Sequence, residues 1–459
     1  MVVSLALDLA YLVVAVIALP WVLWRRLAGG RPIAAPLARF MGRVEIAPRP
    51  AASRRVWLHG VSVGEVQLLA TVAAELKRQA EEAGRQIDCV ISSSTTTGLA
   101  LADRRFGRDR TFPCPLDFSW AVRRVLRRVE PDLLVLGELE LWPNLLAAAA
   151  SRGVPVAIVN GRMSPRSFRG FSRVRPLAAA MLSRVRLVLA RSQEDAQRFT
   201  ALGAPTVQAV GSLKFDGVSG DRQAEPVCRL RQLAGLGPPT PVLLAGSTQE
   251  PEEALAVATL VALRPRHPAL RLVLVPRHAE RAGTLASWLN ERLRLPDAEG
   301  LRWDRRSQRA EEAQPEPPAD ILLVDVTGEL AAWWGVATVA FVGGSLDGVR
   351  GGQNMLEPAA YAAAVCFGPH TRNFRSEVTE LLAANAAQVV SDGESLTAFV
   401  GHCLDDPSFA AGMGERARRV IDANRGATAT TVSHLLRLLP GDSPLPVAGG
   451  GQNPDTGAS

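Results

Sequence analysis

Short apolar runs alternate along most of the chain with segments whose apolar residues recur every three or four positions. Runs of this length suit buried strands, and the segments between them have the spacing of amphipathic helices. In the first half the predicted strands are Val56–Leu58, Asp88–Ser92, Leu133–Leu136, Val154–Val159, Leu187–Ala190 and Val207–Val210. In the second half they are Val242–Ala245, Leu272–Val275, Ile321–Val324, Val339–Val342, Val365–Phe367 and Gln388–Val390. Strands that alternate with helices predict a parallel sheet in each half.

The chain of 459 residues is long enough for two hydrophobic cores. We therefore predict an α/β protein with two Rossmann-like domains that face a cleft. The predicted parts are an N-terminal domain at 28–211, an interdomain linker at 212–240, a C-terminal domain at 241–439 and a disordered Gly- and Pro-rich tail at 440–459. The predicted helices lie at about 65–83, 98–106, 119–129, 142–151, 174–184, 192–202, 394–404 and 408–438. The last two can pack onto either half.

The first segment differs from the rest because residues 2–24 are almost wholly apolar, with Asp8 and Pro20 among the few interruptions. Its length is sufficient to cross a bilayer. Arginines follow it and no basic residue precedes it, which orients the body of the protein toward the cytoplasm and does not fit a signal peptide. The sequence thus predicts a membrane anchor at 1–27. A helix that lies in the membrane interface is the alternative.

The composition narrows the choice of partners. The 52 basic and 45 acidic residues give a formal net charge of +7, which suits phosphates, nucleotides, sugar acids or an acidic membrane surface. No basic run is interleaved with aromatic residues, so we expect no nucleic-acid partner. The five cysteines are scattered without a C-x-x-C pair, and we predict reduced core residues rather than a disulfide framework or a metal site.

Glu65 is the first residue that suggests chemistry. It follows the strand Val56–Leu58 and two glycines, Gly60 and Gly64, at the point where helical spacing begins. The first turn of a helix favours a carboxylate, and ligands of open α/β sheets bind at the carboxyl ends of strands. Taken alone, the residue can equally serve only to complement the helix dipole.

Other charged residues also follow predicted strands in the first half. Glu138 and Glu140 come after Leu133–Leu136 and have side chains on the same face, although one of them can instead cap the next helix. Lys214 comes after Val207–Val210. Its ammonium group can meet a carboxylate or a phosphate, but a lone surface lysine is usually only solvated.

The second half has the residues expected of an anion or nucleotide site. Arg277 follows the strand Leu272–Val275 and carries a planar fork that suits a phosphate or a base edge. Glycine-rich loops at 343–345 and 351–354 allow backbone N–H groups to approach a phosphate. The carboxylate of Glu357 can accept hydrogen bonds from two ribose hydroxyls together.

Eight separate stretches together resemble one family, the 3-deoxy-D-manno-octulosonic acid (Kdo) transferases of Gram-negative lipopolysaccharide synthesis, which have the GT-B fold. The stretches span nearly the whole folded chain in the order of the family. They are His59–Glu65, Glu138–Asn144, Asn160–Ser164, Gly211–Lys214, Ala245–Thr248, Pro276–His278, Gly328–Glu329 and Phe341–His370.

The resemblance implies transfer of Kdo from CMP-Kdo to a hydroxyl of a lipid A precursor, with inversion and without a metal or other cofactor. It implies an enzyme at the cytoplasmic side of the inner membrane, in contact with membrane lipids. The N-terminal domain would take the lipid and the C-terminal domain the nucleotide. Arg162, Arg166 and Arg169 would then receive lipid A phosphates, or they form a solvated loop.

The resemblance also assigns roles by position. Glu65 corresponds to the catalytic base, and Glu138 and Lys214 to residues that assist at the reaction centre, with Glu140 as second choice to Glu138. The positions implied in CMP binding are Pro276, Arg277, Thr327, Gly328, Glu329, Asn354, Met355, Leu356 and Glu357. The sequence departs from the family at Leu139, Gln249 and Gln353, where contacts with substrates can differ.

Two other functions fit the same features. One is another membrane-associated GT-B glycosyltransferase that uses a UDP or CDP donor. The other is an anchored two-domain protein that binds an anion without catalysis.

Overall fold

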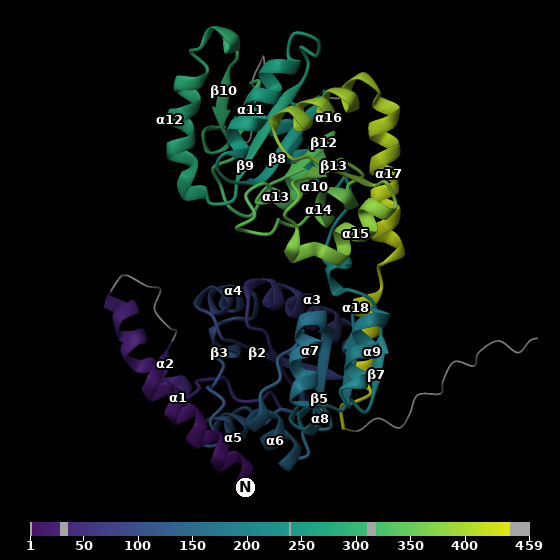
Figure 1. Cartoon of the computed structure of the whole chain (residues 1–459). Coiled ribbons are helices and arrows are strands. Elements are labelled where there is room, and N and C mark those ends of the chain that lie inside the picture. Colours follow the sequence, from purple (N-terminus) through teal and green to yellow (C-terminus); the bar gives the residue numbers. More distant parts are fainter. Residues whose placement is uncertain (1, 28–34, 238–239, 310–317, 441–459) are drawn as a thin grey trace, which may run out of the picture. The chain divides into compact units, whose positions relative to one another are not determined.

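The computed structural model describes residues 2–27, 35–237, 240–309 and 318–440. These residues form two compact units, and each has its own parallel sheet (Figure 1). The first unit contains the chain up to Asp216 together with the residues from Gly426 onward, and the second contains Gly217–Arg425. The prediction of two parallel α/β domains is confirmed.

The described part of the first unit has a seven-stranded sheet in the order β3-β2-β1-β4-β5-β6-β7. The strand order reverses between β1 and β4, and this switch point is where doubly wound sheets bind ligands. The strands are β1 Ser53–His59, β2 Gln86–Ser93, β3 Thr111–Pro113, β4 Leu133–Gly137, β5 Val156–Gly161, β6 Leu187–Ala190 and β7 Val207–Ala209. The helices are α1 Val2–Leu27, α2 Pro36–Met41, α3 Val63–Glu82, α4 Thr96–Phe106, α5 Ser119–Val129, α6 Pro143–Ser151, α7 Pro165–Arg173, α8 Arg175–Leu182, α9 Gln193–Ala201 and α18 Ala427–Leu436.

Alternation along the central strands builds a core on each face of this sheet. In β1, Val56 and Leu58 pack on the face that α3, α4 and α18 cover, whereas Trp57 packs on the opposite face with α5, α6, α8 and α9. Both faces of the sheet are therefore covered, as parallel sheets require. The uncovered edge at the carboxyl ends of β1 and β4 remains for a ligand site.

The second unit repeats the plan with a seven-stranded sheet in the order β10-β11-β9-β8-β12-β13-β14 among its described residues. Its switch point lies between β8 and β12. The strands are β8 Val242–Thr248, β9 Arg271–Pro276, β10 Trp303–Arg305, β11 Ile321–Leu323, β12 Val339–Val342, β13 Ala364–Phe367 and β14 Ala387–Val389. The helices are α10 Glu225–Leu233, α11 Glu252–Leu263, α12 Ala282–Arg292, α13 Leu330–Trp333, α14 Leu356–Ala360, α15 Arg375–Ala383, α16 Gly393–Asp405 and α17 Pro407–Ala423.

Several boundaries differ from those predicted. The supposed linker at 212–240 contains the helix α10, and the chain belongs to the second unit from Gly217 onward. The helix predicted at 408–438 is two helices, because the chain turns at Gly426, whose φ of 98° is left-handed. The second of them, α18, belongs to the first unit rather than to the predicted domain at 241–439.

Other predictions also differ from the structure or fall outside its described residues. Arg166 and Arg169 lie on the helix α7 and not in a loop. The three-residue edge strands β3 and β10 were not predicted. The disordered tail predicted at 440–459 lies, except for residue 440, outside the described residues, as do residues 28–34 at the start of the predicted N-terminal domain.

The N-terminal helix α1 is tied to its unit by a buried aspartate. Asp8 is only 4% exposed. Its carboxylate accepts hydrogen bonds from the Ser119 N–H at 2.8 Å, the Ser119 hydroxyl at 2.5 Å and the Asn144 side-chain amide at 3.1 Å. Ser119 and Asn144 begin α5 and α6, so the carboxylate lies where the dipoles of both helices favour negative charge. The polar interruption in the apolar segment thus has a structural role.

The predicted transmembrane anchor is not confirmed. The helix itself forms over Val2–Leu27. Within the described ranges, no helix has both the length and the apolarity that crossing a bilayer requires.

We expect Asp8→Ala to lower the free energy of unfolding by about 2–4 kcal/mol, because it leaves buried donors on Ser119 and Asn144 without an acceptor. Chemical denaturation of the full chain measures this change. Asp109→Ala, at an exposed position of the same unit, is the matched control and should shift the transition by less than about 0.5 kcal/mol. Equal stability of the two variants would contradict the assigned role of Asp8.

Candidate functional site

Glu65 occupies the third position of α3, directly after β1 at the switch point of the first unit. Ser62 caps the helix, and Ser62 and Glu65 form a capping box. The Glu65 carboxylate accepts the Ser62 hydroxyl at 2.8 Å, the Val61 N–H at 3.0 Å and the Ser62 N–H at 3.3 Å. The helix-start role that the sequence left open is therefore present. The side chain is nevertheless only half-buried, so the carboxylate also reaches solvent.

The end of β4 brings a second carboxylate beside Glu65. A Cβ on Gly137 would lie 3.5 Å from Oε2 of Glu65, which places the Glu65 carboxylate against this strand end. The next residue, Glu138, has a left-handed φ of 51°, and its N–H donates to the Val159 carbonyl at 3.0 Å. Non-glycine residues adopt this conformation rarely and often at functional sites.

Burial and mutual repulsion raise the pKa values of both glutamates after β4. The pKa of Glu138 is raised by burial and then by the charge of Glu65, and the charges of Lys214, Arg162 and Arg191 oppose this effect. The pKa of Glu140 is raised from its usual 4.5 to about 7 by burial and by the charge of Glu65. A hydrogen bond of 3.0 Å from the Trp142 indole limits the rise.

Lys214 lies in a short 3₁₀ helix, Leu213–Phe215, that belongs to the first unit and not to a linker. Asn160 at the end of β5 holds this turn, since its side-chain oxygen accepts the Leu213 N–H at 3.2 Å. The structure thus brings Glu65, Glu138 and Lys214 to one edge of one sheet. Asn160 and Arg191 were not predicted as site residues, although each lies at the carboxyl end of a parallel strand.

His59 and Leu139 belong to the motifs of this edge but pack into the fold. His59 is fully buried, and burial lowers its pKa to about 4, so the imidazole is neutral. Its Nδ1 lies 3.0 Å from the Ser92 hydroxyl, which joins β1 to β2. Leu139 packs against the apolar core, which accounts for an apolar residue at this position.

In the second unit, Glu357 lies in the first turn of the helix α14 and is held by two donors. The Trp334 indole donates to it at 2.9 Å and the Asn354 amide at 3.1 Å. Burial raises the pKa of Glu357, while these bonds and the nearby charge of Arg277 lower it. Gly246 of β8 leaves the space that the Trp334 ring occupies, because a Cβ there would collide with the ring. Arg277 itself is exposed at the end of β9.

The other predicted nucleotide residues differ in what they can offer. Thr327 and Gly328 are exposed after β11, and Pro276 ends β9. Met355 and Leu356 are fully buried, and the Leu356 N–H donates to the Asn354 side-chain oxygen at 3.1 Å, so the structure shows no surface of either residue open to a ligand. Glu329 is held by Arg306 through two hydrogen bonds of 2.8 and 3.0 Å and by the Trp333 indole. Its carboxylate is therefore largely committed within the protein.

The glycine-rich loop after β12 holds a carboxylate of the protein itself. Glu252, only 2% exposed at the start of α11, accepts the N–H groups of Gly344 at 2.8 Å, Ser345 at 3.0 Å and Leu346 at 3.3 Å. It also accepts the Gln249 N–H at 2.9 Å. The prediction that the amides of Gly344 and Ser345 hold a phosphate is therefore wrong. Sequence reasoning missed Glu252, although, like Glu65, it opens the helix after the first strand of its sheet.

The two glutamines that depart from the expected motifs lie beside each other. A Cβ on Gly344 would be 3.2 Å from the side-chain nitrogen of Gln353 and 3.7 Å from that of Gln249. The side-chain amides therefore border the same loop. Among the described residues, no three His, Cys, Asp or Glu side chains are arranged to hold a metal ion.

Comparison with known proteins identifies the family that this chain resembles. Residues 38–217 match a family model described as 3-deoxy-D-manno-octulosonic-acid transferase (kdotransferase). The 3-deoxy-D-manno-octulosonic acid transferase of Bordetella pertussis is 35% identical over 427 residues, which cover 90% of this chain and 94% of the relative. That of Haemophilus influenzae is 31% identical over 390 residues, 84% of this chain and 86% of the relative. The crystal structure of a glycosyltransferase from Rickettsia africae covers 85% of this chain and all of its own, with a TM-score of 0.55 and 11% identity, which concerns the fold alone.

We expect the Glu140 carboxyl group to titrate near pH 7 and its pKa to fall in Glu65→Gln, because that change removes a neighbouring negative charge. NMR of carboxyl-labelled glutamate measures both values. The folded pKa exceeds the unfolded one, so the folded state binds more protons. Glu140 therefore makes the free energy of unfolding fall as the pH rises from about 4.5 to about 7.

Glu140→Gln should remove this part of the pH dependence of stability. Glu81→Gln, at an exposed position of α3, should leave it unchanged. A Glu140 titration near pH 4.5 in the unmodified chain would contradict the burial of this carboxyl group and its proximity to Glu65.

Proposed function

The chain belongs to the 3-deoxy-D-manno-octulosonic acid (Kdo) transferases, and we propose that it transfers Kdo from CMP-Kdo to a hydroxyl of a lipid A precursor with inversion. The observation that carries the chemistry is the grouping of Glu65, Glu138 and Lys214 at the switch point of the first unit. The two parallel α/β units fit a GT-B glycosyltransferase, with the acceptor assigned to the first unit and the nucleotide to the second.

Glu65 is the proposed general base. Its half-exposed carboxylate takes the proton of the acceptor hydroxyl as that oxygen attacks the anomeric carbon of Kdo. The bond between this carbon and the phosphate oxygen breaks, and CMP leaves with the electron pair. The hydrogen bonds from Ser62 and Val61 fix the orientation of the carboxylate before the substrate arrives.

The neighbouring charges explain how an acidic site accepts an acidic sugar. Kdo carries a carboxylate, which three ionised glutamates would repel. Glu140, with a pKa of about 7, is partly protonated at neutral pH, and the positive charges of Lys214, Arg162 and Arg191 act on Glu138. We assign Lys214 to the Kdo carboxylate or to the phosphate, where it stabilises the charge that develops on the leaving group.

The nucleotide contacts follow from the second unit. Arg277 is exposed and suits the phosphate of CMP, and Glu357 suits the two ribose hydroxyls because Trp334 and Asn354 hold its carboxylate in place. Thr327 and Gly328, which are exposed, are assigned to the rest of the nucleotide. Gln249 and Gln353 then offer neutral amides to the donor. We propose no metal or other cofactor.

Variants of Glu65 and Glu357 should separate the rate of Kdo transfer from the affinity for CMP. We expect Glu65→Gln to lower the rate of Kdo transfer by about 10²–10⁴-fold with CMP affinity unchanged. Glu357→Gln should weaken CMP binding by about tenfold or more with the fold intact. Transfer is read from the mass of the lipid product and affinity from calorimetry.

Glu82→Gln, at an exposed position at the end of α3, is the matched control for both measurements. Normal transfer by Glu65→Gln would refute the base, and unchanged CMP affinity in Glu357→Gln would refute the ribose contact. Stabilisation of the chain by UDP but not by CMP would favour another donor.

We also propose that the enzyme works at the cytoplasmic surface of the inner membrane, with α1 in contact with lipid. The helix exposes several large apolar side chains, among them Leu9 at 65% and Ile17 at 74%. The helix α5, to which Asp8 of α1 binds, exposes Arg123, Arg124, Arg127 and Arg128. Apolar side chains beside a basic surface suit an interfacial helix on anionic lipids.

The double variant Leu9→Asn with Ile17→Asn should bind vesicles that contain anionic lipid at least about tenfold more weakly, because two apolar anchors are lost. Co-sedimentation measures this affinity. Leu295→Asn changes an exposed leucine of the second unit and should have no effect. Equal vesicle binding by the unmodified chain, the double variant and Leu295→Asn would place the lipid contact elsewhere.

A further inference from the structure

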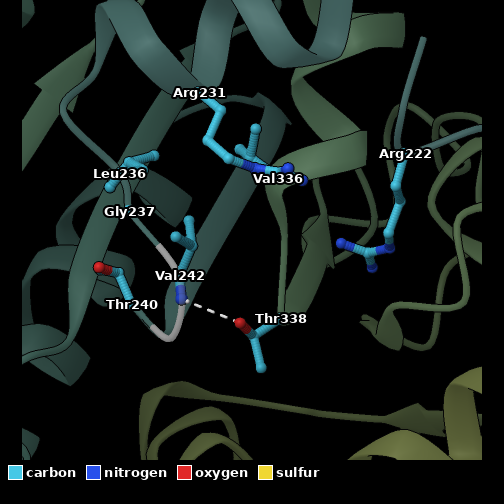
Figure 2. Close-up of a pocket in the computed structure, with 8 residues that line it drawn as sticks. All are labelled: Arg222, Arg231, Leu236, Gly237, Thr240, Val242, Val336 and Thr338. Atoms are coloured by element: carbon cyan, nitrogen blue, oxygen red, sulfur yellow. Dashed lines mark hydrogen bonds between the residues drawn. The ribbon is translucent and has the colours of Figure 1, made fainter.

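A pocket of about 300 Å³ lies in the second unit at the edge of the sheet opposite the nucleotide residues (Figure 2). It is lined at the start of β8 by Val242 and just before β12 by Thr338. Arg277 and Glu357 instead follow the carboxyl ends of β9 and β12 along the chain. A strand of seven residues such as β8 spans roughly 20 Å, so the pocket is separate from the proposed CMP site.

The pocket has an uncompensated positive charge. Arg222 and Arg231 line it, and no acidic residue is among the lining residues. Figure 2 shows the two side chains on separate segments, with the Arg231 side chain ending near Val336. They are close enough for the charge of Arg231 to lower the pKa of Arg222, after the larger effect of burial. Like charges held together without a carboxylate indicate a place for an anion.

The two arginines differ in whether their guanidinium groups already have hydrogen-bond partners in the protein. Arg222 donates to three backbone carbonyls, those of Tyr361 at 2.7 Å, Gly335 at 2.9 Å and Ala337 at 2.9 Å, and thus holds the pocket wall in place. Arg231 projects from the last turn of α10, and its side chain forms no hydrogen bond or ion pair with the described part of the chain. Its guanidinium group therefore has donors available for a ligand.

The remaining lining gives the ligand its polar and apolar contacts. The hydroxyl oxygen of Thr338 accepts the Val242 N–H at 3.1 Å, so its proton is left to donate. Thr240 adds a second hydroxyl. Leu236, Val242 and Val336 form an apolar wall, and the volume exceeds that of a bare phosphate ion.

We propose that this pocket binds a small phosphorylated molecule, with the phosphate on Arg231 and the Thr338 hydroxyl and its carbon skeleton against the apolar wall. Guanidinium groups bind phosphates through parallel hydrogen bonds, which makes Arg231 the residue that decides affinity. This site does not depend on the proposed transfer reaction.

Calorimetry of the full chain tests the proposal, in an Arg277→Gln background that removes the cation proposed for the phosphate at the nucleotide site. Glucose 1-phosphate and inorganic phosphate are the probes, at constant ionic strength. We expect one glucose 1-phosphate per chain and a loss of at least tenfold in affinity in Arg231→Gln. Arg231→Lys should retain part of the affinity because it keeps the charge. Arg419→Gln, an exposed arginine of the same unit, is the matched control and should bind normally.

The outcomes separate the possibilities. Tighter binding of glucose 1-phosphate than of inorganic phosphate supports a phosphorylated ligand, whereas equal binding of the two overturns the apolar contact and leaves a site for free phosphate. Affinity that is unchanged in Arg231→Gln, or that is lost equally in Arg419→Gln, overturns the site. Thermal melting of each variant shows whether it is folded. If Arg231→Gln is not folded, the affinity of Arg231→Lys for the probe decides instead.

Discussion

A carboxylate at the start of the helix that follows the first strand is the interaction on which each half of the structure depends. In both sheets the order of strands reverses beside this strand, so the first helix begins at the edge where ligands gather. Its free N–H groups and positive dipole end require an acceptor. Glu65 meets this need in the first unit through the capping box with Ser62. Glu252 occupies the corresponding place in the second unit, where it binds the amides of the next loop.

The same local arrangement has opposite consequences in the two units because the surroundings differ. Glu252 is enclosed by the loop after β12 and accepts four backbone N–H groups, so its charge is used to hold the fold. Glu65 is half-exposed and has two further glutamates nearby, and its charge raises the pKa of each. Partly buried like charges are costly unless cations or protons offset them. Lys214, Arg162 and Arg191 provide the positive charge, which makes this edge suited to proton transfer rather than to rigidity.

Most of the fold follows from the hydrophobic pattern because its central strands are continuous apolar runs covered on both faces. The strands β6 and β12 begin and end at the predicted residues. The edge strands β3 and β10 contain three residues each and leave no such pattern. The helix α10 was hidden because it lies in a region bounded by Gly and Pro. Gly426 divides the last predicted helix through a left-handed turn, and no apolar spacing reports which unit α18 will cover.

The candidate site was predictable only as far as position along strands decides it. Glu65, Glu138 and Lys214 share an edge because parallel strands end on the same side, and this conclusion needs no knowledge of packing. Hydrogen-bond partners do depend on packing. The sequence therefore could not distinguish a glutamate that is accessible to a ligand from one that the protein itself binds. Glu329 and Glu252 precede or open helices after strands just as Glu65 does, yet Arg306 and the loop amides take their carboxylates. Asp8 shows the reverse case. It interrupts an otherwise apolar segment, yet its buried carboxylate binds Ser119 and so holds the helix against its unit. A glutamate in such a position is thus a catalytic candidate only when its oxygens remain accessible, and that is a property of the folded chain.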